Sequence, residues 1–216
     1  MKFLKSAVCI AAMLFAGLCA SAQDNPYPEE NDEETAAYAL TVTFSGQKPG
    51  INDFINTMLA EPEDEHNGAL SEMWERHQKN KPEKNEKVTV DSKNGFVSFE
   101  SSYPDDNSKS ITEICYWNCS DTKHKIIGES VKIFQDGKPV QTEFTGIFFY
   151  VYNNQTHKMT YINWHDMGAN VDAGENVVTY SLPRVGKDIT AVVYEKNGKT
   201  KSVVLKWNGL RFDVQK

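Results

Sequence analysis

The sequence predicts an α+β fold in which an N-terminal helical hairpin packs on a large, mostly antiparallel β-meander. Ten short apolar-rich runs follow one another from residue 87 onwards without an intervening helical period, so parallel crossovers are not expected. Four dipeptides suited to tight hairpin turns punctuate these runs: Asn94-Gly95, Asp136-Gly137, Asn197-Gly198 and Asn208-Gly209. The alternative is a sheet that curls into a barrel, or a sandwich.

The centre of the sheet is predicted at Thr145–Trp164. Two apolar runs there flank the polar break Asn153-Asn154-Gln155-Thr156, which is the composition of a hairpin turn. Side chains alternate between the faces of a strand, and the first run is apolar or aromatic in both parities. This strand should therefore be buried on both faces.

The chain begins with a pattern typical of a signal peptide, residues 1–22. Lys2 and Lys5 precede a short apolar run, and Ala20-Ser21-Ala22 matches the small-x-small cleavage pattern. Lipidation of Cys19 is the alternative, but the bulky residue before this cysteine disfavours it. We expect cleavage after Ala22 and a secreted or periplasmic product that does not insert into the membrane.

Residues 23–36 form the predicted acidic, disordered leader, and residues 37–216 the predicted single domain. Asp24–Glu34 carries six acids and no basic residue, so self-repulsion disfavours order. The chain of 216 residues retains 194 after cleavage, enough for a sizeable core, and its net charge changes from −7 to −9. Such an acidic protein has no electrostatic basis for binding nucleic acid.

Two amphipathic helices are predicted between about Ile51 and Asn80. Pro49-Gly50 opens the first helix, and prolines follow the end of each. Apolar residues recur at helical spacing, at Ile51, Phe54, Ile55, Met58 and Leu59 in the first helix and at Leu70, Met73, Trp74 and His77 in the second. Each helix therefore has one apolar side that needs a sheet to cover it.

The strands are predicted from alternating, β-branched and aromatic runs. A first strand is expected at Leu40–Phe44, before the helices. The ten later strands are expected at Lys87–Asp91, Phe96–Ser101, Ile111–Trp117, Lys125–Phe134, Thr145–Tyr152, Lys158–Trp164, Val177–Ser181, Ile189–Glu195, Lys201–Trp207 and Leu210–Val214.

Cys115 and Cys119 are the cysteines that remain after cleavage. Residues four apart in a strand are about 13 Å apart, whereas a disulfide tolerates roughly 7 Å between Cα atoms. A disulfide therefore requires the strand to end near Tyr116 and turn through Asn118. A structural disulfide and two buried thiols both remain open, and no catalytic role is expected because the spacing is not C-x-x-C.

An aromatic face of the sheet is the predicted binding site. Tyrosines and tryptophans are plentiful on the predicted central strands, and two short helices cannot cover ten strands. An aromatic face left open would suit a protein or glycan partner, because rigid rings contribute large contact areas at low entropy cost. The residues we expect to line it are Tyr150, Tyr152, Tyr161 and Trp164.

The loop at residues 163–175 is the alternative site. Asp166, Asn170, Asp172 and Glu175 could supply oxygen ligands to Ca²⁺, although their spacing does not match the established calcium loop. With His165, the carboxylates of this loop would form the centre of a metal-assisted hydrolase. A plain surface connection is the simpler interpretation.

No set of acid, base and nucleophile can be assembled from sequence motifs, and no cofactor is expected. The first hypothesis is therefore an exported, non-enzymatic binding module, with the hydrolase and a structural envelope component as alternatives. The overall plan resembles that of small exported bacterial proteins, a resemblance of architecture that assigns no functional residue.

Overall fold

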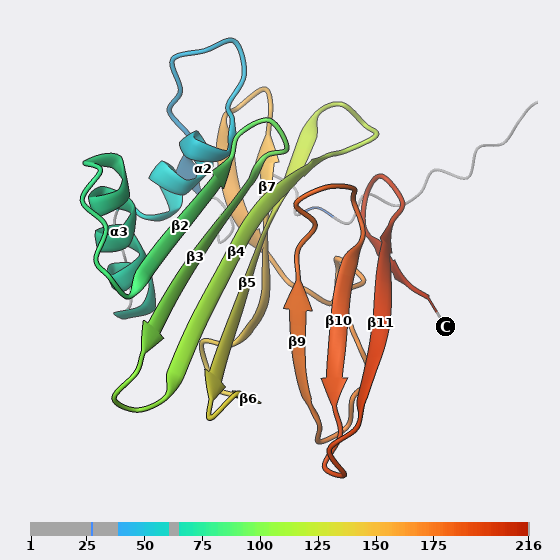
Figure 1. Ribbon diagram of the computed structural model, residues 1–216. Coiled ribbons are helices and arrows are strands. Elements are labelled where there is room, and N and C mark those ends of the chain that lie inside the picture. Colours follow the sequence, from blue (N-terminus) through green and yellow to red (C-terminus); the bar gives the residue numbers. More distant parts are fainter. Residues whose placement is uncertain (1–26, 28–38, 61–64, 216) are drawn as a thin grey trace, which may run out of the picture.

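The computed structural model describes Tyr27, residues 39–60 and residues 65–215 (Figure 1). The expected signal peptide lies outside the described residues, and so does the acidic leader except for Tyr27. Within the described residues the fold is mostly antiparallel β-structure with two helices, α2 (Ile51–Met58) and α3 (Glu65–Gln78).

The strands form two antiparallel sheets. The larger sheet has the order β1-β8-β7-β5-β4-β3-β2, with β6 paired to β5, and the smaller has the order β12-β11-β10-β9. Neither sheet closes on itself within the described residues. The larger sheet comprises β1 (Leu40–Thr41), β2 (Glu86–Asp91), β3 (Phe96–Tyr103), β4 (Ser108–Asn118), β5 (His124–Gln135), β6 (Lys138–Val140), β7 (Gly146–Asn153) and β8 (Lys158–Ile162). The smaller comprises β9 (Val177–Ser181), β10 (Ile189–Tyr194), β11 (Thr200–Trp207) and β12 (Phe212–Val214).

The hairpin turns follow the dipeptide pattern. Gly95, Gly137, Gly198 and Gly209 all have positive φ and connect neighbouring antiparallel strands. The break at Asn153–Thr156 connects β7 to β8, and β7 lies between β5 and β8 inside the larger sheet. The predicted antiparallel β-structure is therefore confirmed, and β7 lies inside the larger sheet, although the middle strand of that sheet is β5.

Two elements differ from the sequence prediction. The first strand pairs at only two residues, Leu40 with Met159 and Thr41 with Lys158. Val42, the residue after β1, bonds to His157, which precedes β8 and belongs to the β7–β8 turn. The pairing of β1 therefore stops where β8 begins. The short strand β6 was not predicted; its proline at position 139 gave no strand signal.

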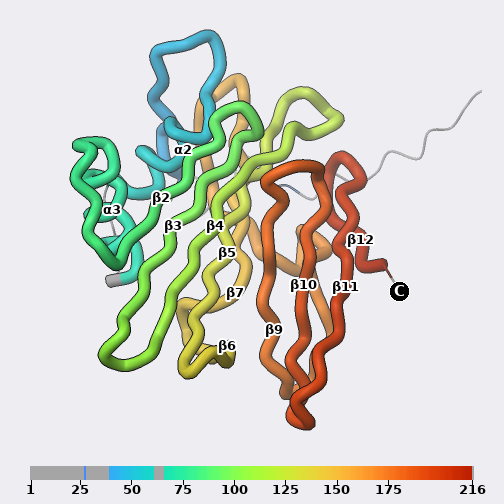
Figure 2. The backbone as a smooth tube through the Cα atoms, viewed as in Figure 1, coloured from blue at the N-terminus to red at the C-terminus, as the bar shows by residue number. Residues whose placement is uncertain are grey.

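The strands were expected in one large sheet, and the structure divides them between two. Alternation along β5 shows how the layers are built. Ile126 belongs to a core shared with the smaller sheet, whereas Ile127 belongs to a core shared with α2 and α3. The helices and the smaller sheet therefore cover opposite faces of the larger sheet, and Figures 1 and 2 show them on its two sides. In Figure 2, β12 lies at the outer edge of the smaller sheet.

Candidate functional site

A pocket of about 630 Å³ lies where α2 ends beside β1, β7 and β8. This volume falls within the range of about 300–1,000 Å³ that small-molecule sites occupy. Its described lining comes from all four of these elements and from the first turn of α3: Ala39, Leu40, Thr41, Thr43, Asn56, Thr57, Met58, Ala60, Asn67, Tyr150, Met159 and Tyr161.

Two tyrosines form the aromatic wall of this pocket. Tyr150 and Tyr161 lie directly opposite each other on β7 and β8, so both point to the helix-covered face. Their ring centroids are 5.9 Å apart at an interplanar angle of 81°, the edge-to-face geometry that aromatic pairs favour. Tyr150 packs against the helix-side core, whereas Tyr161 is 49% exposed. The pocket thus has one partly buried aromatic ring, that of Tyr150, and one solvent-exposed ring, that of Tyr161.

The polar groups of the lining are uncharged. The described lining contains amides and hydroxyls but no Asp, Glu, Lys, Arg or His. The amide of Asn56 is oriented by bonds that its oxygen accepts from Trp74 Nε1 at 2.8 Å and from Gln78 Nε2 at 3.2 Å. The hydroxyl of Thr41 accepts from Lys158 Nζ at 2.7 Å. The pocket can therefore offer neutral hydrogen-bonding groups from fixed positions.

The structure brings together two of the four predicted binding residues. Tyr152 is fully buried. Its ring centroid lies 5.2 Å from that of Phe54, and its hydroxyl lies 2.8 Å from His157 Nδ1. Burial raises the pKa of Tyr152. Trp164 packs against the core between the two sheets and stacks on His165 at 3.7 Å. Tyr150 and Tyr161 are therefore the predicted residues that line the pocket.

The alternative site does not form a cluster of metal ligands. Among the described residues, no group of three His, Cys, Asp or Glu side chains could hold a metal ion. Glu175 is instead ion-paired with Lys196, and Asp166 lies in a turn closed by a bond from its N–H to Asn163 O at 3.0 Å. Asn170 and Asp172 lie on the same connection, after β8.

The two cysteines are unbonded and buried. β4 continues through Asn118, so the turn that a disulfide requires does not come between Cys115 and Cys119. Both side chains face the core between the sheets. Burial raises the pKa of Cys115 well above its usual value and that of Cys119 to about 11.

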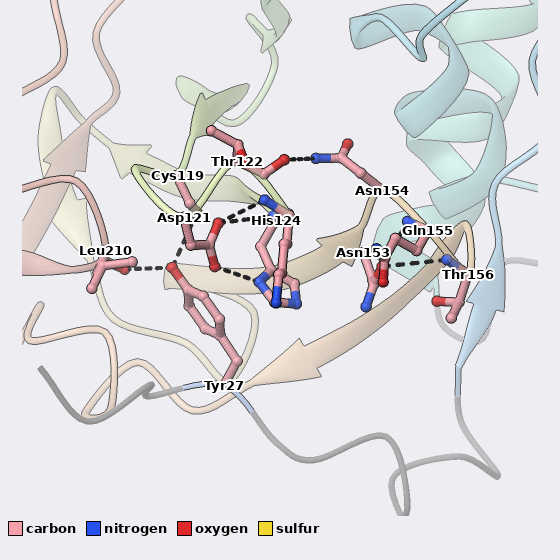
Figure 3. Close-up of polar contacts among 11 residues, drawn as sticks. Tyr27, Cys119, Asp121, Thr122, His124, Asn153, Asn154, Gln155, Thr156 and Leu210 are labelled. Atoms are coloured by element: carbon pink, nitrogen blue, oxygen red, sulfur yellow. Dashed lines mark hydrogen bonds and ion pairs between the residues drawn. The ribbon is translucent and has the colours of Figure 1, made fainter. Parts of the chain in front are cut away.

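A polar cluster at the β4–β5 turn was not predicted from the sequence. Tyr27, Cys119, Asp121 and His124 form this hairpin cluster (Figure 3). Asp121 Oδ2 lies 2.6 Å from His124 Nδ1, and the Tyr27 ring lies 4.9 Å from the His124 ring. The i, i+3 spacing of Asp121 and His124 could have indicated their contact, but no local signal reveals that Tyr27 joins them.

A second unpredicted pair lies between α3 and the larger sheet. His66 Nε2 is 3.8 Å from Glu129 Oε1, and neither atom has a hydrogen-bond partner in the described part of the chain. Glu129 is 4% exposed and lies opposite Ile114 and Phe148. Nearby on the same face, the buried hydroxyl of Thr112 also lacks a hydrogen-bond partner among the described residues. The alternation of side chains along β5 places Glu129 on the face that the helices cover. This alternation is the sequence signal that could have indicated a buried carboxylate.

Comparison with protein-family models, with curated proteins and with solved structures finds no match. Within the residues that the structure describes, neither helix is long and apolar enough to cross a membrane.

Proposed function

We propose that the protein is a non-enzymatic binding module whose pocket takes a neutral, hydroxyl-rich ligand of the glycan class. The observation that carries this proposal is the exposed ring of Tyr161 beside a described lining of amides and hydroxyls without a charged side chain. The C–H face of a sugar ring can pack on an aromatic ring while the sugar hydroxyls bond to neutral polar groups.

The uncharged lining also disfavours charged ligands. Moving an ionised group out of water is unfavourable unless a counter-charge meets it, and no charged side chain is among the described lining residues; the Lys158 ammonium lies behind Thr41 and is bonded to its hydroxyl. By contrast, the second pocket, of about 560 Å³ at the β3–β4 turn, includes Lys109, whose ammonium lies 2.8 Å from Glu100 Oε2. A neutral ligand therefore suits the Tyr150–Tyr161 pocket better than a phosphorylated or carboxylated one.

The proposal includes the wider context of the chain. Residues 1–22 would direct export to a secreted or periplasmic location, which the targeting pattern supports. Residues 37–216 would form one α+β domain, in which α2 and α3 make a helical hairpin on the larger sheet. The buried apolar residues that both helices contribute to one core support that description.

The test is a binding titration with neutral oligosaccharides, namely maltose, cellobiose and chitobiose, followed by isothermal calorimetry and protein NMR. Tyr161→Ala should weaken binding about tenfold, which is ~1.4 kcal/mol, and Tyr161→Phe should retain it because the ring remains. Tyr103→Ala is the matched control, because Tyr103 is 46% exposed but lines the other pocket. Its affinity should equal that of the wild type.

Two outcomes would overturn the proposal. Equal affinity in the wild type and Tyr161→Ala would place any sugar binding elsewhere. No binding of these sugars, with Tyr161-dependent binding of a neutral peptide instead, would keep the pocket but reject the glycan class. A structural envelope component would bind neither probe.

A further inference from the structure

The pair formed by His66 and Glu129 contains two buried polar atoms that lack a hydrogen bond. Glu129 lies on β5 with its side chain only 6% exposed, and His66 lies in the first turn of α3 with its side chain 17% exposed. The carboxylate oxygen Oε1 and the imidazole nitrogen Nε2 are 3.8 Å apart, beyond the reach of a hydrogen bond, and neither atom bonds to another described residue. A buried carboxylate is normally hydrogen-bonded and met by a counter-charge, so this pair is incomplete.

The surroundings of the pair supply no other counter-charge. The described side chains that adjoin it are apolar, aromatic or hydroxyl groups: Ala69 and Leu70 one turn later on α3, Thr112 and Ile114 on β4, Ile127 and Val131 on β5, Phe144 before β7, and Phe148 and Tyr150 on β7. Among them only the phenol of Tyr150 can titrate, and a phenol gives no positive charge. The imidazole of His66 is therefore the group that can neutralise Glu129.

A proton on the imidazole would complete the pair. Histidine takes up a proton between about pH 8 and 5, and the imidazolium donates hydrogen bonds from both of its ring nitrogens. Nε2 would then be a charged donor toward Oε1 of Glu129. A shift of about 1 Å would bring these two atoms to the separation of about 2.7–2.9 Å that charge-assisted hydrogen bonds have.

The first turn of α3 also forms part of the wall of the proposed ligand pocket. Asn67, the residue after His66, lines that pocket. On the larger sheet, Tyr150 of the pocket lies opposite Ile127, which is the neighbour of Glu129 on the same face of β5. The pair therefore lies one row of side chains away from the pocket, and a bond between His66 and the sheet would hold the pocket wall in place.

We propose that His66 and Glu129 form a proton-operated latch, which ties the first turn of α3 to the larger sheet at acidic pH and so fixes one wall of the ligand pocket. The latch requires no opening of the core, because donor and acceptor are already 3.8 Å apart. Leu70, Met73 and Trp74 hold the rest of the helix in the core at every pH. The effect on the pocket rests on the proposed function, whereas the latch itself does not.

Amide hydrogen exchange of the segment that contains His66 measures the latch, by peptide mass spectrometry at pH 5.5 and pH 8. Each variant is compared with the wild type at the same pH, so the intrinsic pH dependence of exchange cancels. At pH 5.5, this segment should exchange about fivefold faster in His66→Gln than in the wild type, and at pH 8 the two proteins should exchange equally. Peptides from β10 and β11 should show no difference at either pH.

Three further variants separate the latch from a general effect on the helix. His66→Lys keeps a positive charge at both pH values, so its protection relative to His66→Gln should be the same at pH 8 as at pH 5.5. In a Glu129→Gln background, His66→Gln should change exchange at neither pH, because the acceptor charge is gone. His77→Gln is the matched control, because His77 stacks on Trp74 of the same helix and forms no ion pair with a described residue. Its exchange should equal that of the wild type.

Equal exchange of the wild type and His66→Gln at pH 5.5 would overturn the latch, and so would an equally large difference at pH 8. A difference that persists in the Glu129→Gln background would show that Glu129 is not the acceptor and would also overturn it. If Glu129→Gln fails to fold, Glu129→Leu carries the same test.

Sugar titrations at the two pH values test the link to the pocket separately. A sugar that binds the wild type should bind about threefold more tightly at pH 5.5 than at pH 8, because a fixed wall lowers the cost of ordering the site. The two affinities should be equal in His66→Gln. The same threefold ratio in both proteins would overturn the link to the pocket. If no sugar binds at either pH, the proposed function and the link both fail, while hydrogen exchange still decides the latch.

Discussion

Removal of the Glu113 carboxylate should destabilise the contact between the two sheets. Lys132 Nζ lies 2.9 Å from Glu113 Oε1 and donates to Ser181 Oγ at 3.2 Å. The second carboxylate oxygen accepts the N–H of Leu182 at 2.9 Å, just after β9. The side chains of Lys132 and Glu113 are only 7% and 16% exposed. Glu113 therefore bonds β4 to β5 and to the smaller sheet at once.

The magnitude follows from what Glu113→Ala leaves behind. It leaves a buried ammonium without its counter-charge, which typically lowers the free energy of unfolding by ~3–5 kcal/mol. The unpaired N–H of Leu182 belongs to the same loss. For a domain of this size, ~1 kcal/mol corresponds to roughly 2–4 °C, so the melting temperature should fall by about 6–20 °C. Glu113→Gln, which keeps an acceptor for Leu182, should lose less.

A double-mutant cycle in urea denaturation separates charge from packing. Glu113→Ala combined with Lys132→Met removes both charges, so the double variant should be more stable than Glu113→Ala alone. A loss below ~1 kcal/mol in Glu113→Ala would refute the reasoning. So would a double variant as unstable as the single one, because the loss would then come from packing and not from the orphaned ammonium.

Phe149→Ala should lower the free energy of unfolding by ~3–5 kcal/mol in urea denaturation, because this fully buried ring leaves a cavity between the sheets; a loss below ~1 kcal/mol would contradict this. Gly168→Ala should be destabilised by ~2 kcal/mol or more in the same assay, since φ is +67° and an added Cβ would lie 2.1 Å from Phe212 O. A stability unchanged from the wild type would mean that this connection can shift. Glu129→Leu should leave the free energy of unfolding unchanged or increase it by ~1–2 kcal/mol in urea denaturation, because an apolar side chain replaces a poorly partnered buried carboxylate. A clear decrease in that free energy would indicate that the carboxylate has a partner. Mass spectrometry of the exported protein should find Gln23 at the N-terminus, and lipid-modified Cys19 would disprove this processing.

Local turn chemistry and alternation predicted most of the strand framework. Asn-Gly and Asp-Gly dipeptides suit positive φ, and Gly95 and Gly198 adopt it where expected. Apolar residues in both parities placed β7 inside the sheet, and Phe149 and Tyr152 are both fully buried on its opposite faces. These signals come from residues that are close together in the sequence, so one amino-acid sequence is sufficient to recognise them.

Contacts between distant segments were not predictable in the same way. Alternation along β5 shows that Ile126 and Ile127 face opposite cores, but it does not tell which element covers each face. A second sheet covers one of them, so the predicted open aromatic face is reduced to the region of Tyr161. Trp164 was expected on that face together with Tyr161, but β8 ends at Ile162 and the chain leaves the sheet before it. Tyr27 looked like part of a solvated leader because its contacts are 92 and 183 residues away.

The pocket itself follows from the short length of α2, which packs on β7. α2 has eight residues and is therefore only ~12 Å long. Phe54 on its buried side packs on Tyr152, which is fully covered, while Tyr161 lies beyond the helix and stays 49% exposed. β1 pairs with β8 at only two residues, at the edge of the same sheet, and so adds no layer over this face. An aromatic residue that the alternation of β8 directs to the helix side thus remains 49% exposed beside the end of α2, and the ligand that we propose would cover its ring.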